Sequence, residues 1–212
     1  PPVPEQPNFL LILVDDLGYT DLSVMGSSYY QTPHIDQLAQ HSSIFTEGYA
    51  ASPVCSPSRA SLMTGTYVTR HGITDWIGAP TGTEWRATGR HTRLLPPDYQ
   101  HSLPHQLTTL PEALKTAGYR TFFAGKWHLG SAEQASLPTD HGFDINRGGF
   151  QQGGPYTGGY FSPFNNPYLE DHPTEQGISL SLKLANETST FIEANQGQPF
   201  FACLSFYAVH AP

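Results

Sequence analysis

Short, almost entirely apolar runs are the clearest pattern along the chain. Three of them have the length of β-strands and are bounded by polar or turn-forming residues: 9–14, 119–125 and 199–207. The first, FLLILV, is apolar at every position, which is typical of a strand in the buried centre of a parallel sheet. Residues 44–50 form a further strand candidate.

Helix start and stop signals lie between these strands. A threonine–proline pair predicts a helix over about 33–42, with Ile35 and Leu38 on its apolar face. Ser56 followed by proline repeats the cap signal and predicts a short helix that ends at Gly65.

Two more helices are predicted in the second half of the chain. Residues 109–118 carry both a start and a stop signal. Residues 177–195 begin with strand-like alternation, but the segment is too long for a strand, and we therefore predict a helix. The segments 76–108 and 129–176 are rich in glycine and proline and are predicted to be mostly loop.

The order of these elements predicts an α/β fold, in which helices sandwich a mostly parallel sheet, within one domain over residues 1–212. Ligands of such sheets bind beyond the carboxyl ends of the strands. Polar clusters lie at or shortly after the ends of predicted strands: Asp15-Asp16, Cys55 to Arg59, Lys126 to His128, and His210.

Composition narrows the function classes. The formal net charge of −8 over 212 residues argues against nucleic acid or an anionic membrane as the main partner. No run approaches the ~20 apolar residues of a membrane span. The opening PPVPEQP is compatible with the start of a mature exported protein, so we expect a periplasmic, secreted or lysosomal location.

Asp15 and Asp16 are adjacent carboxylates at the end of an apolar run. Their oxygens suit a hard cation such as calcium or magnesium. A solvated turn or a helix cap explains such a pair about equally well. The chain has no zinc-binding motif.

Cys55 lies where a helix is predicted to begin, and backbone N–H groups there favour an anion. Arg59 follows about one helical turn later and is able to reach the same place. Taken alone, a packed thiol or a disulfide with Cys203 is the better explanation of Cys55. Cys203 itself is predicted to be buried and structural.

Lys126 and His128 follow a strand and, in extended geometry, point the same way. A lysine offers a positive charge to an anionic substrate, and a histidine exchanges a proton near neutral pH. A surface lysine and a capping histidine are the simpler explanation of this pair, and the same holds for His210.

Together these clusters occur in a characteristic order. The stretches PNFLLILVDDLGYTDL, TPHIDQLA, VCSPSRASLMTGTY, GYRTFFAGKWHLG, HGFD and VHAP span nearly the whole chain. In this order they resemble the sulfatases of the alkaline-phosphatase-like superfamily, and Cys-x-Pro-Ser-Arg followed by Thr-Gly is the most specific part. The resemblance implies a sulfatase catalytic domain that hydrolyses sulfate esters.

The resemblance also implies a modified nucleophile. In the family this cysteine is oxidised to formylglycine by a modifying enzyme, a partner that would recognise Cys55 together with Pro57 and Arg59. One hydroxyl of the hydrated aldehyde attacks sulfur and displaces the alcohol. The second hydroxyl then loses its proton, sulfate leaves, and the aldehyde returns.

The other roles implied by the resemblance concern the metal and the sulfate. Asp15, Asp16 and residue 55 would bind calcium, with magnesium as the alternative ion. Arg59 would hold the formylglycine hydroxyls, and His128 would hydrogen-bond the hydrate. Lys126 and His210 would contact the sulfate oxygens.

The chain departs from the family pattern in one respect. Members carry a further Asp-Asn pair in the calcium shell and a later lysine on the sulfate, both after the histidine that His210 matches. Residues 1–212 contain neither, so we expect them to be the N-terminal part of a longer catalytic domain, incomplete at its C-terminus.

The family motifs do not fix the substrate. A sulfated carbohydrate and an aryl sulfate both fit, as does the alternative of a phosphodiesterase or phosphonate hydrolase of the same superfamily. A non-catalytic module that binds sulfated glycan is a second alternative. Specificity is expected to come from the loops, and the residues of the 76–108 loop considered for it, which are equally compatible with ordinary surface positions, are Trp76, Trp85, Arg86, Arg90 and His91.

Overall fold

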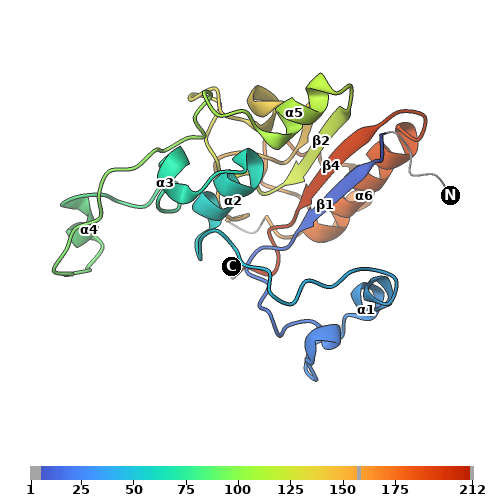
Figure 1. Ribbon diagram of the computed structural model, residues 1–212, viewed down its shortest axis with the longest axis horizontal. Coiled ribbons are helices and arrows are strands. Elements are labelled where there is room, and N and C mark those ends of the chain that lie inside the picture. Colours follow the sequence, from blue (N-terminus) through green and yellow to red (C-terminus); the bar gives the residue numbers. More distant parts are fainter. Residues whose placement is uncertain (1–5, 157–158, 211–212) are drawn as a thin grey trace.

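A computed structural model of the chain describes residues 6–156 and 159–210, so Ala211 and Pro212 of the last motif lie outside the described residues. The sheet is built from the parallel strands β1 (Phe9–Leu13), β2 (Arg120–Gly125), β3 (Ile145–Arg147) and β4 (Phe200–Ser205), in the order β1-β4-β2-β3 (Figure 1). The prediction of a parallel α/β sheet is confirmed.

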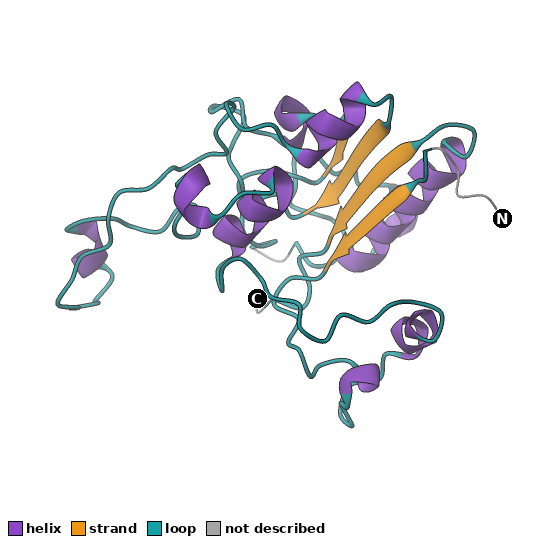
Figure 2. Cartoon of the chain, in the orientation of Figure 1, coloured by secondary structure: helices purple, strands orange, loops and turns teal. Residues whose placement is uncertain are grey.

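Some of the helices flank the sheet, and others lie away from it (Figure 2). The α-helices are α1 (Pro33–Ala39), α2 (Cys55–Thr64), α3 (Val68–His71), α4 (Glu84–Ala87), α5 (Leu110–Thr116) and α6 (Leu180–Ala194). Short 3-10 helices are η1 (Ser23–Met25), η2 (Pro138–His141) and η3 (Pro173–Glu175). No helix of the described residues is both long enough and apolar enough to cross a membrane.

Each face of the sheet carries its own apolar core, because successive strand residues point to opposite sides. On one face Phe123, Phe201 and Cys203 pack with Ala60 and Met63 of α2. This packing places the amino end of α2 beside the carboxyl ends of the strands, where the polar clusters lie.

Helix α6 covers the opposite face. Its Leu184 is fully buried against this face, and the ring of its Phe191 stacks on Phe122 of β2 with centroids 4.6 Å apart. The helix begins after Ser179, whose hydroxyl accepts a hydrogen bond from the Leu182 N–H as an N-cap. The choice of a helix over 177–195 is therefore confirmed.

Strand β1 differs from its prediction. It forms an edge of the sheet among the described residues, and Phe9 and Ile12 are 42% and 50% exposed. The prediction of a buried central strand is therefore wrong for this structure. The apolar run favours burial, but β1 pairs only with β4 within the described chain.

The segment between β1 and α2 also departs from expectation. Residues 44–50 form no strand, and Phe45 and Tyr49 are 84% and 85% exposed. Helix α1 exists, yet its apolar residues Ile35 and Leu38 are exposed as well. Figure 1 shows why: η1 and α1 lie apart from the sheet and its cores, so local propensity decides their conformation while burial does not.

Two boundaries depend on tertiary contacts that the pattern does not reveal. β3 has three residues, too few for a recognisable period, and it exists through pairing with β2. Helix α2 begins at Cys55 after Val54, so the predicted N-cap Ser56 lies inside the first turn. The C-cap prediction holds, because Gly65 adopts the left-handed conformation with φ 64° and donates to the Ser61 carbonyl.

Gly125 gives a test of how the strands converge. It ends β2 at φ +105°, and a Cβ atom there would collide with the backbone carbonyl of Ser205 at the end of β4. We expect Gly125→Ala to lower the free energy of unfolding by about 3 kcal/mol or more, since the ends of both strands must separate.

Gly118→Ala is the matched control for this variant. Its φ of +86° is also left-handed, but no atom lies within 4 Å of the added Cβ, so only the conformational cost of about 1 kcal/mol applies. Urea unfolding of the two variants measures the difference. Equal losses would show that the ends of β2 and β4 are not in contact.

Candidate functional site

The seven residues predicted for the site lie together at the carboxyl ends of the strands. They line two adjoining cavities of about 280 and 310 Å³. The first contains Asp15 and Arg59, the second Lys126, His128 and His210, and both are lined by Asp16 and Cys55. The juxtaposition that the sequence predicted is therefore present.

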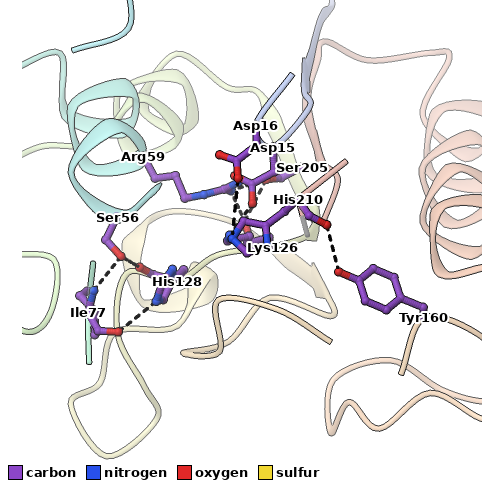
Figure 3. A network of polar contacts seen from close by, with 10 residues as sticks. All are labelled: Asp15, Asp16, Ser56, Arg59, Ile77, Lys126, His128, Tyr160, Ser205 and His210. Carbon is purple, nitrogen blue, oxygen red and sulfur yellow. Dashed lines mark hydrogen bonds and ion pairs between the residues drawn. The ribbon is translucent and has the colours of Figure 1, made fainter. Parts of the chain in front are cut away.

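Asp15 is the buried centre of this region (Figure 3). Its Oδ1 accepts from Nη2 of Arg59 at 2.7 Å, and its Oδ2 accepts from Nζ of Lys126. Nη1 of Arg59 also donates to the Lys126 carbonyl and to the Ser205 hydroxyl, both at 2.6 Å. One carboxylate thus joins the end of β1 to helix α2 and to the end of β2, and Ser205 adds β4.

The charges around Asp15 set its ionisation. Burial alone would raise the pKa of Asp15, but the positive charges and hydrogen bonds of Arg59 and Lys126 outweigh it, so the pKa is lowered from 3.8. The charges of Arg59 and Lys126 are matched in number by the carboxylates of Asp15 and Asp16, and Asp16 lines both cavities. Lys126 lines the second cavity and is able to contact an anionic ligand such as sulfate.

Asp16 is placed differently from its neighbour. It has φ 58°, its side chain is 62% exposed, and its Oδ2 lies 3.8 Å from Nε2 of His210. The carbonyl of His210 accepts from the Tyr160 hydroxyl at 3.4 Å. Asp16 and His210 therefore lie at the rim of the second cavity, while the buried Asp15 lines the first.

Cys55 is the first residue of α2, and its thiol is free and partly buried. Cys203 is also free, so the disulfide considered as an alternative is wrong. Cys203 lies inside β4, where burial raises the pKa of its thiol to about 12, and the prediction of a buried structural cysteine is confirmed. Only Cys55 lines the cavities.

His128 is held by a hydrogen-bonded clamp that also includes Ser56 and Ile77 (Figure 3). The Ser56 hydroxyl donates to the His128 carbonyl at 2.9 Å and accepts from the Ile77 N–H at 3.0 Å, and the Ile77 carbonyl lies 3.0 Å from Nε2 of His128. A carbonyl only accepts, so Nε2 carries the hydrogen. Nδ1 is buried and has no partner among the described residues.

Burial lowers the pKa of His128 to about 4, so the ring is neutral at pH 7. With the hydrogen on Nε2, Nδ1 presents a lone pair.

The extended geometry predicted for Lys126 and His128 is wrong, because His128 has φ 55°. The turn nevertheless brings both side chains to the same cavity.

The fit to a metal ion is partial. A calcium ion takes roughly six to eight oxygen ligands. Both oxygens of Asp15 are engaged by cations, and Asp16 offers its carboxylate at the rim. Across residues 6–156 and 159–210, no group of three or more His, Cys, Asp or Glu side chains is arranged to hold a metal. The carboxylates of Asp15 and Asp16 fit calcium in kind, whereas residue 55 would supply an oxygen ligand only after modification of its thiol. Their role as ligands stays a prediction.

Several residues of the site were missed by the sequence analysis. Ser205 carried a usable signal, being the polar residue at the end of an apolar strand. Ser56 was seen only as a cap. Gly153 and Tyr156 line the second cavity from the glycine-rich loop, where no periodic pattern marks them.

The loop candidates divide between two places. Trp76 lines the second cavity. Trp85, Arg86, Arg90 and His91 belong to the long arm around α4, which projects from the body of the molecule (Figure 1). There the guanidinium of Arg90 lies 4.6 Å over the Trp85 ring, so the two residues pair with each other.

A parallel α/β sheet with a cavity of charged and polar side chains at the carboxyl ends of its strands has the arrangement of a ligand-binding α/β domain. The model of the sulfatase family matches residues 7–212, and the chain belongs to the sulfatase family.

Similar proteins agree with this assignment. The chain is 34% identical, over 99% of its length, to the N-acetylgalactosamine-6-sulfatase of Canis lupus familiaris, and 31% identical, over 97%, to the arylsulfatase of Hemicentrotus pulcherrimus. It spans 41% and 37% of these relatives. Among solved structures, Ps i-CgsB in complex with k-i-k-neocarrahexaose has a TM-score of 0.73 and 30% identity, covering 98% of this chain and 46% of that one.

The buried position of Asp15 predicts a large effect on stability. Asp15→Asn leaves two buried cations without a charged partner, and we expect the free energy of unfolding to fall by about 3–5 kcal/mol. Asp16→Asn, at the exposed neighbour, is the control and should change it by about 0.5 kcal/mol or less. Urea unfolding at pH 7 compares the variants, and similar losses would contradict the central role of Asp15.

The same carboxylate predicts a pH dependence. Because the folded-state pKa of Asp15 is lowered, its stabilising contribution is present above the unfolded value of 3.8 and is lost as the pH falls through the folded value. The acid limb of the stability profile should therefore become shallower in Asp15→Asn than in the wild-type protein.

Proposed function

We propose that the protein hydrolyses sulfate esters by transferring the sulfuryl group to a nucleophile at residue 55. The observation that carries this proposal is the placement of Cys55, Arg59, Lys126 and His128 around two adjoining cavities at the carboxyl ends of the strands. Family membership supports the same reaction. The helix N-terminus at Cys55 adds a favourable environment for the transferred anion.

The nucleophile is proposed to be a formylglycine made from Cys55 by a sulfatase-modifying enzyme. A hydrated aldehyde at this position would supply two hydroxyls on one carbon, one to accept the sulfuryl group and one to drive its release. Nδ1 of His128 carries a lone pair, is buried without a partner among the described residues, and is available to take a hydroxyl proton.

The charged residues are proposed to act on the sulfate itself. Lys126 and His210 line the second cavity and would contact the sulfate oxygens. Arg59 would offset the charge that accumulates near residue 55, while its guanidinium donates hydrogen bonds to Asp15, the Lys126 carbonyl and Ser205. His210 lies at the rim and is the better placed of the two to protonate the departing alcohol.

A calcium ion is proposed at the cavity edge, with Asp15, Asp16 and the modified residue 55 among its ligands and magnesium as the alternative ion. A bound cation would withdraw electron density from the attacking oxygen and the sulfate. Asp16 supports this assignment because its carboxylate remains at the rim.

The proposed substrate is a sulfated carbohydrate, since the relatives and solved structures that the chain resembles include an N-acetylgalactosamine-6-sulfatase and a complex with a neocarrahexaose. An aryl sulfate is the competing choice. The proposed location is periplasmic, secreted or lysosomal.

The reaction class is tested by comparing matched esters. The full-length protein should hydrolyse 4-nitrophenyl sulfate with a kcat/KM at least about tenfold above that for 4-nitrophenyl phosphate. Faster turnover of the phosphate would favour a phosphodiesterase-like enzyme. Binding of a sulfated glycan without turnover would favour a non-catalytic module.

The modification of Cys55 gives a direct prediction. Peptide mass spectrometry of protein from its native source should show an aldehyde in place of the CH2SH group at residue 55. Cys55→Ser should retain its fold and lose turnover, because a serine lacks the second hydroxyl that releases sulfate. An unmodified cysteine in a native, active preparation would contradict the proposal.

Metal dependence is checked separately. EDTA should abolish turnover by the full-length protein, and calcium should restore it. Asp16→Asn should raise the calcium concentration that gives half-maximal activity by about tenfold or more, because a charged ligand is lost. Asp98→Asn removes an exposed carboxylate outside the cavities and serves as the control. Identical calcium curves for the two variants would exclude Asp16 as a ligand.

A further inference from the structure

Two aromatic residues, Trp76 and Tyr156, line the cavity that contains Cys55 and the predicted sulfate contacts. They are 42% and 53% exposed, so each presents part of its ring to the solvent. Exposed aromatic side chains beside polar groups in a concave site are typical of ligand-binding surfaces. No step of the proposed sulfuryl transfer uses either ring.

The position of Trp76 is fixed by its neighbours. The next residue, Ile77, is held at its N–H by Ser56 and at its carbonyl by His128. The carbonyl of Trp76 itself accepts from the Tyr99 hydroxyl at 2.7 Å. Behind the ring lies Gly78, where an added Cβ would come within 3.0 Å of Cζ3 of Trp76. The backbone of Trp76 therefore adjoins the clamp that holds His128, and its indole ring lies close to Gly78.

Tyr156 has a corresponding support. An added Cβ at Gly154 would lie 2.9 Å from Cε1 of Tyr156, so the phenol ring packs on glycine backbone. The preceding Gly153 gives the same room to His128, whose Cε1 would lie 2.6 Å from a Cβ at that position. The adjacent residues Gly153 and Gly154 therefore give room to two rings, that of His128 and that of Tyr156.

We propose that Trp76 and Tyr156 are specificity-determining residues that hold the hexopyranose ring bearing the sulfate. This inference rests on the proposed sulfate ester hydrolysis. A pyranose has apolar C–H faces and a polar edge of hydroxyls. The cavity has the same two characters, with aromatic rings on its wall and the carboxylate of Asp16 and the imidazole of His210 at its rim.

The experiment uses the full-length protein and two probes. In a Cys55→Ala background, calorimetry measures the binding of N-acetylgalactosamine 6-sulfate and of inorganic sulfate. In the unsubstituted protein, kcat and KM are measured for the same sugar sulfate. Trp76→Ala and Tyr156→Ala are compared with Trp76→Phe, which keeps an aromatic ring, and with Trp85→Ala, which removes an indole from the same loop but outside the cavity.

The expected results distinguish binding of the sugar ring from binding of the sulfate group. Trp76→Ala and Tyr156→Ala should each weaken binding of the sugar sulfate and raise KM by about tenfold, with kcat and inorganic sulfate binding changed by about twofold or less. Trp76→Phe should recover most of the loss, and Trp85→Ala should match the parent protein.

Other results would overturn the inference. Parallel weakening of sugar sulfate and inorganic sulfate would show that the rings shape the anion cavity, and unchanged sugar binding would show that they contact no sugar. Absence of sugar sulfate binding in the parent, with 4-nitrophenyl sulfate bound, would assign the wall to an aryl group. Ring-dependent sugar binding by a protein that turns over no sulfate ester would uphold the aromatic wall and refute the proposed hydrolysis.

Discussion

The site depends on one buried carboxylate held between two cations. Asp15 stands at the end of β1, Arg59 comes from α2 and Lys126 follows β2. Each of these charges is costly to bury alone, and together they are acceptable because every charge has a partner at hydrogen-bonding distance. Three elements that are distant in the sequence are thereby fixed at the carboxyl edge of the sheet.

The two cations connect this structural role to function. Arg59 and Lys126 are matched by the carboxylates of Asp15 and Asp16, so this part of the site is close to neutral although the chain as a whole carries −8. The site therefore repels an anionic group less than the acidic chain as a whole does, and the helix N-terminus at Cys55 favours an anion there.

The sequence predicted most of the sheet and the meeting of the seven site residues, because both are encoded locally. Apolar runs define strands, and in a parallel sheet their carboxyl ends share one edge. It did not predict β3, the exposure of β1 or the clamp formed by Ser56, since each depends on a partner distant in the chain. The residue types of a segment indicate its preferred secondary structure and burial. Which distant segments it pairs with or packs against is decided by the tertiary fold.

The hydrogen bonds of Ser56 connect chemistry and recognition. Its hydroxyl holds the backbone of His128 and the N–H of Ile77 at the same time. The first contact fixes a ring that is neutral at pH 7 with its Nδ1 lone pair unshared among the described residues, and the second fixes the residue after Trp76. A shift of this clamp would move His128 and the backbone beside Trp76 together. In the proposed reaction these are the proton acceptor and part of the sugar-binding wall, so one local network would set their relative positions, whereas the arm around α4 lies away from it (Figure 1).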